Sequence, residues 1–144
     1  MKYADPQFIK SSQDDYRKAI AERGVTEEQA RAISENVRDQ IPFTHSGHKI
    51  TVAMSRLEGK GIFAVSSISE GEVIAPVRIS GMRTPAGRFT NHSISPNAKM
   101  VVLPTGEIRL VAISQIDASE EVTVNYRLAR EAAIEANRIE GRNQ

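Results

Sequence analysis

Three short segments of the sequence contain residue types that could bind a ligand or take part in catalysis. They are G-K-G at residues 59–61, the polar stretch G-R-F-T-N-H-S-I-S-P-N at 87–97 and the run E-E-V-T-V-N-Y at 120–126. Glycine lets a backbone approach a ligand closely, and Asn, His and Tyr can orient one by hydrogen bonds. Taken singly, each segment is more typical of a tight turn, a structural histidine or a core strand that ends in a buried tyrosine.

Several common chemistries are disfavoured by what the sequence lacks. An apolar strand follows G-K-G and no third glycine is present, unlike the fingerprint of a dinucleotide-binding unit. There is no G-x-S-x-G elbow, and without cysteine the chain has no thiolate zinc site, disulfide or cysteine nucleophile. Lys plus Arg is 19 against 18 for Asp plus Glu, so the net charge of +1 provides no general field for nucleic acid or an anionic membrane.

The length and composition are those of one folded domain with appendages. The chain has 144 residues, of which 40% are hydrophobic and 26% are charged. Its N-terminus lacks the apolar run of a signal peptide, and no window approaches a membrane span. We therefore expect an intracellular, cytoplasmic protein, or a nuclear one if it acts in a eukaryotic host.

Two amphipathic helices are predicted ahead of the segments described above. The first runs from Ser11 or Ser12 to a stop at Gly24. The second opens with a capping box of Thr26 and Gln29 and closes before Pro42. Their apolar faces are expected to contain Tyr16, Ala19 and Ile20 in the first helix and Ala30, Ile33 and Val37 in the second.

The middle of the chain is predicted to be all β. Short β-branched runs separated by Gly, Pro, Asn and Ser indicate strands at 48–54, 61–65, 72–78, 98–103, 107–113 and 121–126. Residues 103–106 are expected to form a hairpin turn. The Ala-rich tail predicts a terminal helix with a loose apolar stripe of Leu128, Ile134 or Ala132, and Ile139.

The order of these segments resembles the SET domain, the family of S-adenosylmethionine-dependent protein lysine methyltransferases. G-K-G-I-F-A is followed by E-G-E-V-I, N-H-S-I-S-P-N, G-E-I-R-L-V-A and E-E-V-T-V-N-Y, and the N-H-S-x-x-P-N segment is specific. The resemblance covers roughly residues 48–127. It implies a mainly β, SET-like β-clip fold with a knot-like core, similar to the compact forms found in viruses and bacteria.

The predicted organisation follows from combining the resemblance with the helical patterns. Residues 1–42 would form an N-terminal helical hairpin, 43–127 the SET-like β-clip domain, and 128–144 a C-terminal helix and tail. The implied activity is transfer of a methyl group from S-adenosylmethionine to a lysine side-chain amine of a protein substrate. No metal is implied.

The resemblance also implies roles for individual residues near the cofactor. The backbone around Gly59, Lys60 and Gly61 would lie against the methionine part of S-adenosylmethionine. Arg88 and Phe89 would lead into the cofactor site. These residues are therefore candidate cofactor-binding residues.

The other implied site residues come from the N-H-S and N-Y segments. Asn91 and His92 would hold the cofactor by side-chain and main-chain hydrogen bonds. Tyr126 would contact the cofactor and serve as the catalytic tyrosine, orienting amine and methyl. Pro96 and Asn97 would fix the knot without touching substrate.

The sequence departs from the family's usual pattern in two places. The segment 78–86 is short where the family commonly inserts a longer piece of the substrate groove, and no aromatic residue follows Tyr126 to close the lysine channel. The rings of that channel would come from a second subunit or from Tyr3, Phe8, Tyr16, Phe43, Phe63 or Phe89. Because the apolar faces of the two N-terminal helices must be buried, we predict that residues 1–41 pack on the β-domain and contribute to a homodimer that helps to complete the substrate groove.

The sequence is also compatible with two functions other than that of an enzyme. A non-catalytic SET-like binding or assembly module would keep the knot for stability, and the missing channel aromatics favour it. A nucleic-acid binder could use the C-terminal arginines Arg127, Arg130, Arg138 and Arg142. It is disfavoured because acidic residues interleave with them, which is typical of a solvated helix face.

Overall fold

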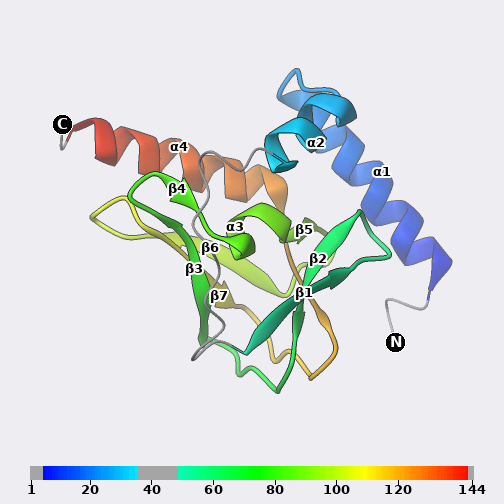
Figure 1. Cartoon of the computed structure of the whole chain (residues 1–144). Coiled ribbons are helices and arrows are strands. Elements are labelled where there is room, and N and C mark those ends of the chain that lie inside the picture. Colours follow the sequence, from blue (N-terminus) through cyan, green and yellow to red (C-terminus); the bar gives the residue numbers. More distant parts are fainter. Residues whose placement is uncertain (1–4, 36–48, 143–144) are drawn as a thin grey trace.

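Two small sheets, one mixed and one antiparallel, with helices at both ends of the chain make up the computed structural model, which describes residues 5–35 and 49–142. Its helices are α1 (Pro6–Glu22), α2 (Glu27–Glu35), α3 (Pro85–Phe89) and α4 (Tyr126–Arg142). Its strands are β1 (Ile50–Met54), β2 (Lys60–Ala64), β3 (Val73–Ile79), β4 (Met82–Arg83), β5 (Asn91–His92), β6 (Ala98–Val102), β7 (Ile108–Ala112) and β8 (Glu121–Val124). The mainly β class with helices at the termini is confirmed (Figure 1). No helix in the described ranges is long and apolar enough to cross a bilayer.

Every strand predicted from β-branched runs is present, with ends that shift only slightly. One sheet has the order β1-β2-β8-β5 and the other β4-β3-β7-β6. The hairpin between β6 and β7 forms as expected, since Gly106 N donates to Leu103 O at 2.9 Å and Leu103 N to Glu107 O at 2.8 Å. The strand pattern was therefore encoded locally, by side-chain type and turn residues.

Two short strands were not predicted. β4 forms a tight hairpin with β3, in which Ser80 and Gly81 both have positive φ, 51° and 77°. β5 lies within the polar stretch that the sequence suggested was irregular, and it pairs in parallel with β8, Asn91 beside Thr123 and His92 beside Val124. Its polar residues form a strand because the pairing is supplied by a segment distant in sequence.

Asn97 joins these two distant segments, as the family resemblance implied for it. Its Nδ2 donates to Glu121 O at 2.8 Å, and its Oδ1 accepts from Thr123 N at 2.8 Å. The side chain therefore occupies the place of a neighbouring strand and satisfies one donor and one acceptor of buried β8.

Apolar residues from both sheets meet in a single hydrophobic cluster. Its completely or almost completely buried members include Ile62, Ile68, Leu110, Ile116, Val122 and Val124. Every residue of β8 is buried, including Glu121 and Thr123. Because β8 is covered on both faces, its sequence alternation does not separate a buried face from an exposed one.

The helix α1 begins earlier than predicted. Its N-cap is Asp5, whose Oδ1 accepts from Gln7 N at 2.9 Å, and Pro6 occupies the first helical turn. An aspartate cap followed by proline is a stronger start than the serine pair at residues 11 and 12, and Ser12 is instead fully buried. The capping box at the start of α2 is confirmed by reciprocal bonds of 2.9 and 3.1 Å between Thr26 and Gln29. Val37 and Pro42 lie outside the described residues.

The helix α4 begins two residues before its predicted start, at Tyr126. The last strand ends at Val124, and Asn125 follows with its Oδ1 accepting from Arg127 N at 2.9 Å. Its carbonyl accepts from Ala129 N at 2.9 Å. Asn125 therefore acts as a helix cap, which is why Tyr126 is the first residue of a helix and not the last residue of a strand.

The predicted apolar stripe of α4 is correct at Ala132 and wrong at Leu128 and Ile134. Leu128 and Ile134 are 58% and 45% exposed, whereas Ala132 and Ala136 are 8% and 0% exposed. A Cβ on Gly106 in the β6–β7 hairpin would lie only 2.8 Å from Glu140 Cγ, so helix and hairpin are in close contact. Small residues therefore form the packed face because larger ones would not fit.

The short helix α3 lies against β3 through a glycine. Thr84 caps α3 by accepting from Gly87 N, and its own hydroxyl donates to Pro76 O at 2.6 Å. A Cβ on Gly87 would lie 2.3 Å from Val77 O. The backbone of β3 cannot move without loss of its pairing to β7, so this position requires glycine.

We expect Gly87→Ala to lower the free energy of unfolding by about 1 to 3 kcal/mol, the usual cost of overpacking. Gly141→Ala is the matched control, because nothing lies within 4 Å of a Cβ there, and it should be neutral or slightly stabilising. Urea unfolding of both variants measures the difference. Equal stability of the two variants would show that α3 tolerates displacement from β3.

Candidate functional site

The side-chain amide of Asn91 joins the G-K-G loop to the last strand. Its Nδ2 lies 3.0 Å from Glu58 O, 3.2 Å from Lys60 O and 2.9 Å from Glu121 Oε2. Asn91 itself is 6% exposed. One buried amide therefore connects β5, the G-K-G loop and β8, which are far apart in the sequence.

Glu121 is the acidic member of this group and is almost completely buried. Its Oε1 accepts from Ser55 Oγ at 2.7 Å, while its Oε2 accepts from Asn91. Burial raises the pKa of Glu121, and the bonds from Ser55 and Asn91 only partly oppose this shift. A Cβ on Gly61 would lie 2.4 Å from Glu121 Oε2, so glycine at this position makes room for the carboxylate.

His92 has both ring nitrogens occupied. Tyr126 N donates to Nδ1 at 3.0 Å, so Nε2 bears the proton of the neutral ring and donates to Asp15 Oδ2 at 2.6 Å. Burial lowers the pKa of His92, although Asp15 opposes the shift. The neutral ring therefore connects α1 to the first residue of α4.

Charged side chains reinforce the attachment of α1. Arg127 Nη1 lies 3.1 Å from Asp15 Oδ2, and Arg127 Nε lies 2.8 Å from Glu22 Oε2. Burial alone would raise the pKa of Asp15, but the bonds from Arg127 and His92 outweigh it and hold that pKa below its usual value. Asp15 is therefore ionised at neutral pH and binds two partners at once.

The ring of Tyr126 packs against α1. It meets the ring of Tyr16 edge-on, with centroids 5.3 Å apart and an interplanar angle of 73°. Its hydroxyl donates to Thr90 O at 3.2 Å. Burial raises the pKa of Tyr126 far above its ordinary value, so the hydroxyl stays protonated and its oxygen can still accept a hydrogen bond.

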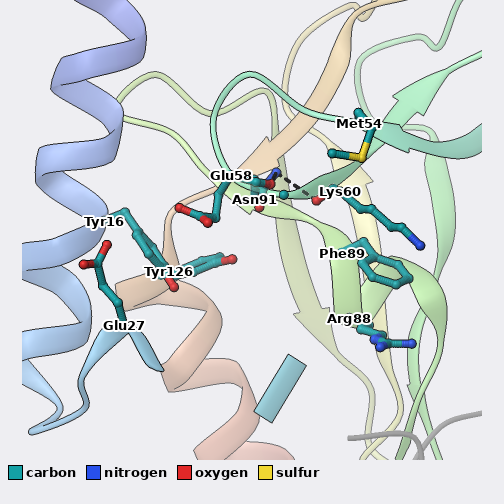
Figure 2. A pocket seen from close by; sticks show the side chains of 10 residues that line it. Tyr16, Glu27, Met54, Glu58, Lys60, Arg88, Phe89, Asn91 and Tyr126 are labelled. Atoms are coloured by element: carbon teal, nitrogen blue, oxygen red, sulfur yellow. Dashed lines mark hydrogen bonds between the residues drawn. The ribbon is translucent and has the colours of Figure 1, made fainter. Parts of the chain in front are cut away.

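A first cavity of about 310 Å³ opens between these tyrosines and the β-domain. Figure 2 shows Tyr16 and Tyr126 together on the side of α1, with Lys60, Phe89 and Arg88 opposite them. The cavity is lined by Tyr16, Glu27, Met54, Glu58, Gly59, Lys60, Arg88, Phe89, Asn91 and Tyr126. We call it the first cavity below.

A second cavity of about 390 Å³ shares Tyr16, Arg88 and Tyr126 with the first. The rest of its lining comes from α1, α2, α3, α4, the β3–β4 hairpin, strands β6 and β7, and the residues that directly follow α1 and α3. Two cavities therefore approach the same pair of tyrosine rings. Two ligands could meet at Tyr126.

The structure brings most of the predicted cofactor residues together. All of them line the first cavity except Gly61 and His92, whose side-chain positions face Glu121 and Asp15. Of the candidate channel rings, Tyr16 and Phe89 line the first cavity, whereas Phe8 and Phe63 do not. Tyr3 and Phe43 lie outside the described residues.

Several residues of the site were not identified from the sequence. Glu27, Met54 and Glu58 line the first cavity, and Asp15 contacts His92 without being singled out. Glu58 adjoins the G-K-G run, so proximity to that motif could have identified it. Nothing local marks Asp15 or Glu27, because their contacts depend on how α1 and α2 lie on the β-domain.

Residues 77–127 match the SET domain family, which confirms the resemblance indicated by the order of the motifs. The match includes the polar stretch 87–97 and Tyr126, and it begins after the G-K-G run. It covers less than half of the chain. No curated protein matches the chain.

Parts of the chain are similar to solved structures from other organisms. A candidate histone methyltransferase of Plasmodium falciparum is 22% identical with a TM-score of 0.45, over 54% of this chain and 96% of that chain. Polycomb Repressive Complex 2 of Chaetomium thermophilum, as a humanized mutant with GSK126, is 22% identical with a TM-score of 0.46, over 56% and 15% of the two chains. Its autoinhibited state gives 20% identity and a TM-score of 0.47, over 65% and 18%. The resemblance to the SET domain rests on the family match over residues 77–127.

We expect Asp15→Ala to lower the free energy of unfolding by about 1 to 3 kcal/mol, because it leaves the Nε2–H of buried His92 without a partner. Asp14→Ala is the matched control on the same helix. Its carboxylate is 52% exposed and pairs with Arg17, so the loss should stay within about 0.5 kcal/mol. Thermal or urea unfolding compares them, and equal effects would show that the His92 contact contributes little.

Glu121→Gln should change how stability depends on pH. Because the pKa of Glu121 is raised in the folded state above the value of 4.5 for an unperturbed carboxyl, its favourable contribution is present below that pH and is lost as pH rises. The stability of the wild type relative to Glu121→Gln should therefore fall as the pH rises above 4.5. Asp15 and His92 titrate in both proteins, so their effects cancel. A difference that does not change with pH would contradict the prediction.

Proposed function

We propose that this protein is a protein-lysine N-methyltransferase that transfers a methyl group from S-adenosylmethionine to a lysine amine of a protein substrate. The observation that carries the proposal is the position of Tyr126, which lines both cavities and lies within the matched SET segment. A transfer between two bound molecules needs such a shared point, because the protein must align donor and acceptor.

The first cavity fits the charges of S-adenosylmethionine, which supplies an electrophilic methyl group on a sulfonium cation. Glu27 and Glu58 are acidic residues that would attract the sulfonium and the ammonium group. Lys60 and Arg88 would attract its carboxylate, and both also lie near the Phe89 ring, 5.8 and 4.6 Å from the centroid. In this proposal Gly59 and Lys60 present backbone to the cofactor. Gly61 and His92 support the site from behind.

Tyr126 would orient the reacting groups without acting as a base. Its hydroxyl proton is committed to Thr90 O, and burial keeps the pKa of the hydroxyl high. The free lone pair can accept a hydrogen bond from the incoming amine. Free lysine has a pKa of about 10.4, so presenting the neutral amine near pH 8 costs about 3 kcal/mol. The guanidinium of Arg88, which lines both cavities, disfavours the ammonium form and lowers that cost.

A non-catalytic SET-like module is the second candidate. It is favoured by the intramolecular bonds of Asn91 Nδ2 and of both His92 ring nitrogens, since a purely structural role would account for these contacts. It leaves the two cavities at Tyr126 unexplained. The homodimer expected from the short 78–86 segment stays a prediction.

Tyr126→Phe tests the proposal, because it keeps the ring and removes one hydroxyl. We expect transfer of labelled methyl from S-adenosylmethionine into lysate proteins to fall by about a hundredfold or more, on the order of a lost positioning hydrogen bond in a transition state. Cofactor affinity by calorimetry and the melting temperature should barely change. They report on binding and folding independently of turnover.

Two results would refute the enzyme assignment. The first is that S-adenosylmethionine at millimolar concentration neither binds the wild type by calorimetry nor raises its melting temperature. A ligand that binds the folded state must do both. The second is equal label incorporation by wild type and Tyr126→Phe. Cofactor binding without any incorporation would favour the non-catalytic module.

A further inference from the structure

The second cavity has a charge pattern that methyl transfer alone does not require. Its lining includes five arginines, one directly after α1 and one each in β3, β4, α3 and α4: Arg23, Arg78, Arg83, Arg88 and Arg130. No aspartate or glutamate lines it within the described ranges 5–35 and 49–142. Because the whole chain has a net charge of only +1, this concentration of positive charge is local.

Apolar side chains form the rest of the second cavity. They include Ile20, Val25, Val77, Met100, Ile108 and Ile134. Ile134 on α4 is 45% exposed, although it is a large aliphatic residue. A surface that combines apolar contacts with arginines suits a peptide better than a small anion, which would use the arginines and leave the apolar wall uncovered.

Arg78 lines the cavity and is incompletely satisfied. Its Nη2 lies 2.8 Å from Glu140 Oε2 and 2.6 Å from Asn137 Oδ1. Its Nε is buried and has no hydrogen-bond partner among the described residues. A buried donor without a partner is costly, and Oε1 of its ion-pair partner Glu140 is also buried without a partner within the described ranges, so this ion pair at the cavity wall is incompletely hydrogen-bonded.

The arginines also affect a lysine that reaches Tyr126 from this side. Neighbouring positive charges disfavour the ammonium form, which helps to present the neutral amine. The same charges repel a basic peptide as a whole. Carboxylates beside the target lysine would offset that repulsion and pair with arginines farther from Tyr126.

We propose that the second cavity binds the substrate segment, and that this segment has Asp or Glu residues next to the target lysine. This inference rests on the proposed function for the chemistry at Tyr126, but it makes a separate claim about binding. The substrate class is an acidic protein segment around a lysine, not a basic tail.

Fluorescence anisotropy with two labelled peptides tests the inference without turnover. One peptide places a lysine between glutamates, and the other places it between arginines. The wild type should bind the acidic peptide at least tenfold more tightly, and the affinity should fall as salt is raised. Arg23→Glu and Arg130→Glu should each weaken acidic-peptide binding severalfold, because both residues are exposed and line the cavity.

Arg138→Glu is the matched control. It lies on α4 like Arg130, is 55% exposed, pairs with Glu135 and does not line the second cavity. It makes the same change in net charge, so it should leave the affinity unchanged. An equal loss in all three variants would overturn the inference in favour of a general charge effect.

Other outcomes are equally decisive. Equal or tighter binding of the arginine-flanked peptide overturns the inference. So does a single-stranded oligonucleotide that binds through Arg23 and Arg130 when the acidic peptide does not. Arginine-dependent binding of the acidic peptide supports the inference even if no methyl is transferred, and in that case only the proposed enzymatic function fails.

Discussion

The buried contact between Asn91 and Glu121 holds the candidate site together. An amide from β5 and a carboxylate from β8 meet at 2.9 Å, and the same amide fixes the carbonyls of Glu58 and Lys60. A carboxylate this deeply buried is costly unless its oxygens accept hydrogen bonds, and Ser55 and Asn91 supply them. The conformation of the G-K-G loop therefore depends on a residue distant in the sequence, and Gly61 leaves the necessary room.

The helix α1 belongs to the site as much as the strands do. Through Asp15 it contacts His92, which in turn accepts from the backbone of Tyr126. Through Tyr16 it places an aromatic ring against Tyr126. The sequence has no aromatic residue after Tyr126, and the N-terminal helix supplies a ring from the other end of the chain.

Local patterns were sufficient for the strands, the capping box of α2 and the grouping of most cofactor candidates. The start of α4 was predicted too late because asparagine can also end a strand. Only the hydrogen bond that Asn125 accepts from Arg127 identifies it as a helix cap. The buried face of α4 was predicted incorrectly at Leu128 and Ile134, because close contact with the β6–β7 hairpin leaves room only for alanines. Asp15 was missed because its partners, His92 and Arg127, lie 77 and 112 residues away. The spacing of apolar residues along one element carries no information on pairs so distant in sequence.

The separation of 112 residues between Asp15 and Arg127 has a consequence for synthesis. α1 is translated well before its ring and ionic partners on α4. Contacts so distant in sequence form late, because the chain must lose the entropy of closing a long loop before these contacts stabilise it. A nascent chain can thus build its sheets while α1 is still undocked. The two cavities acquire their shared aromatic wall only after Tyr126 has been translated.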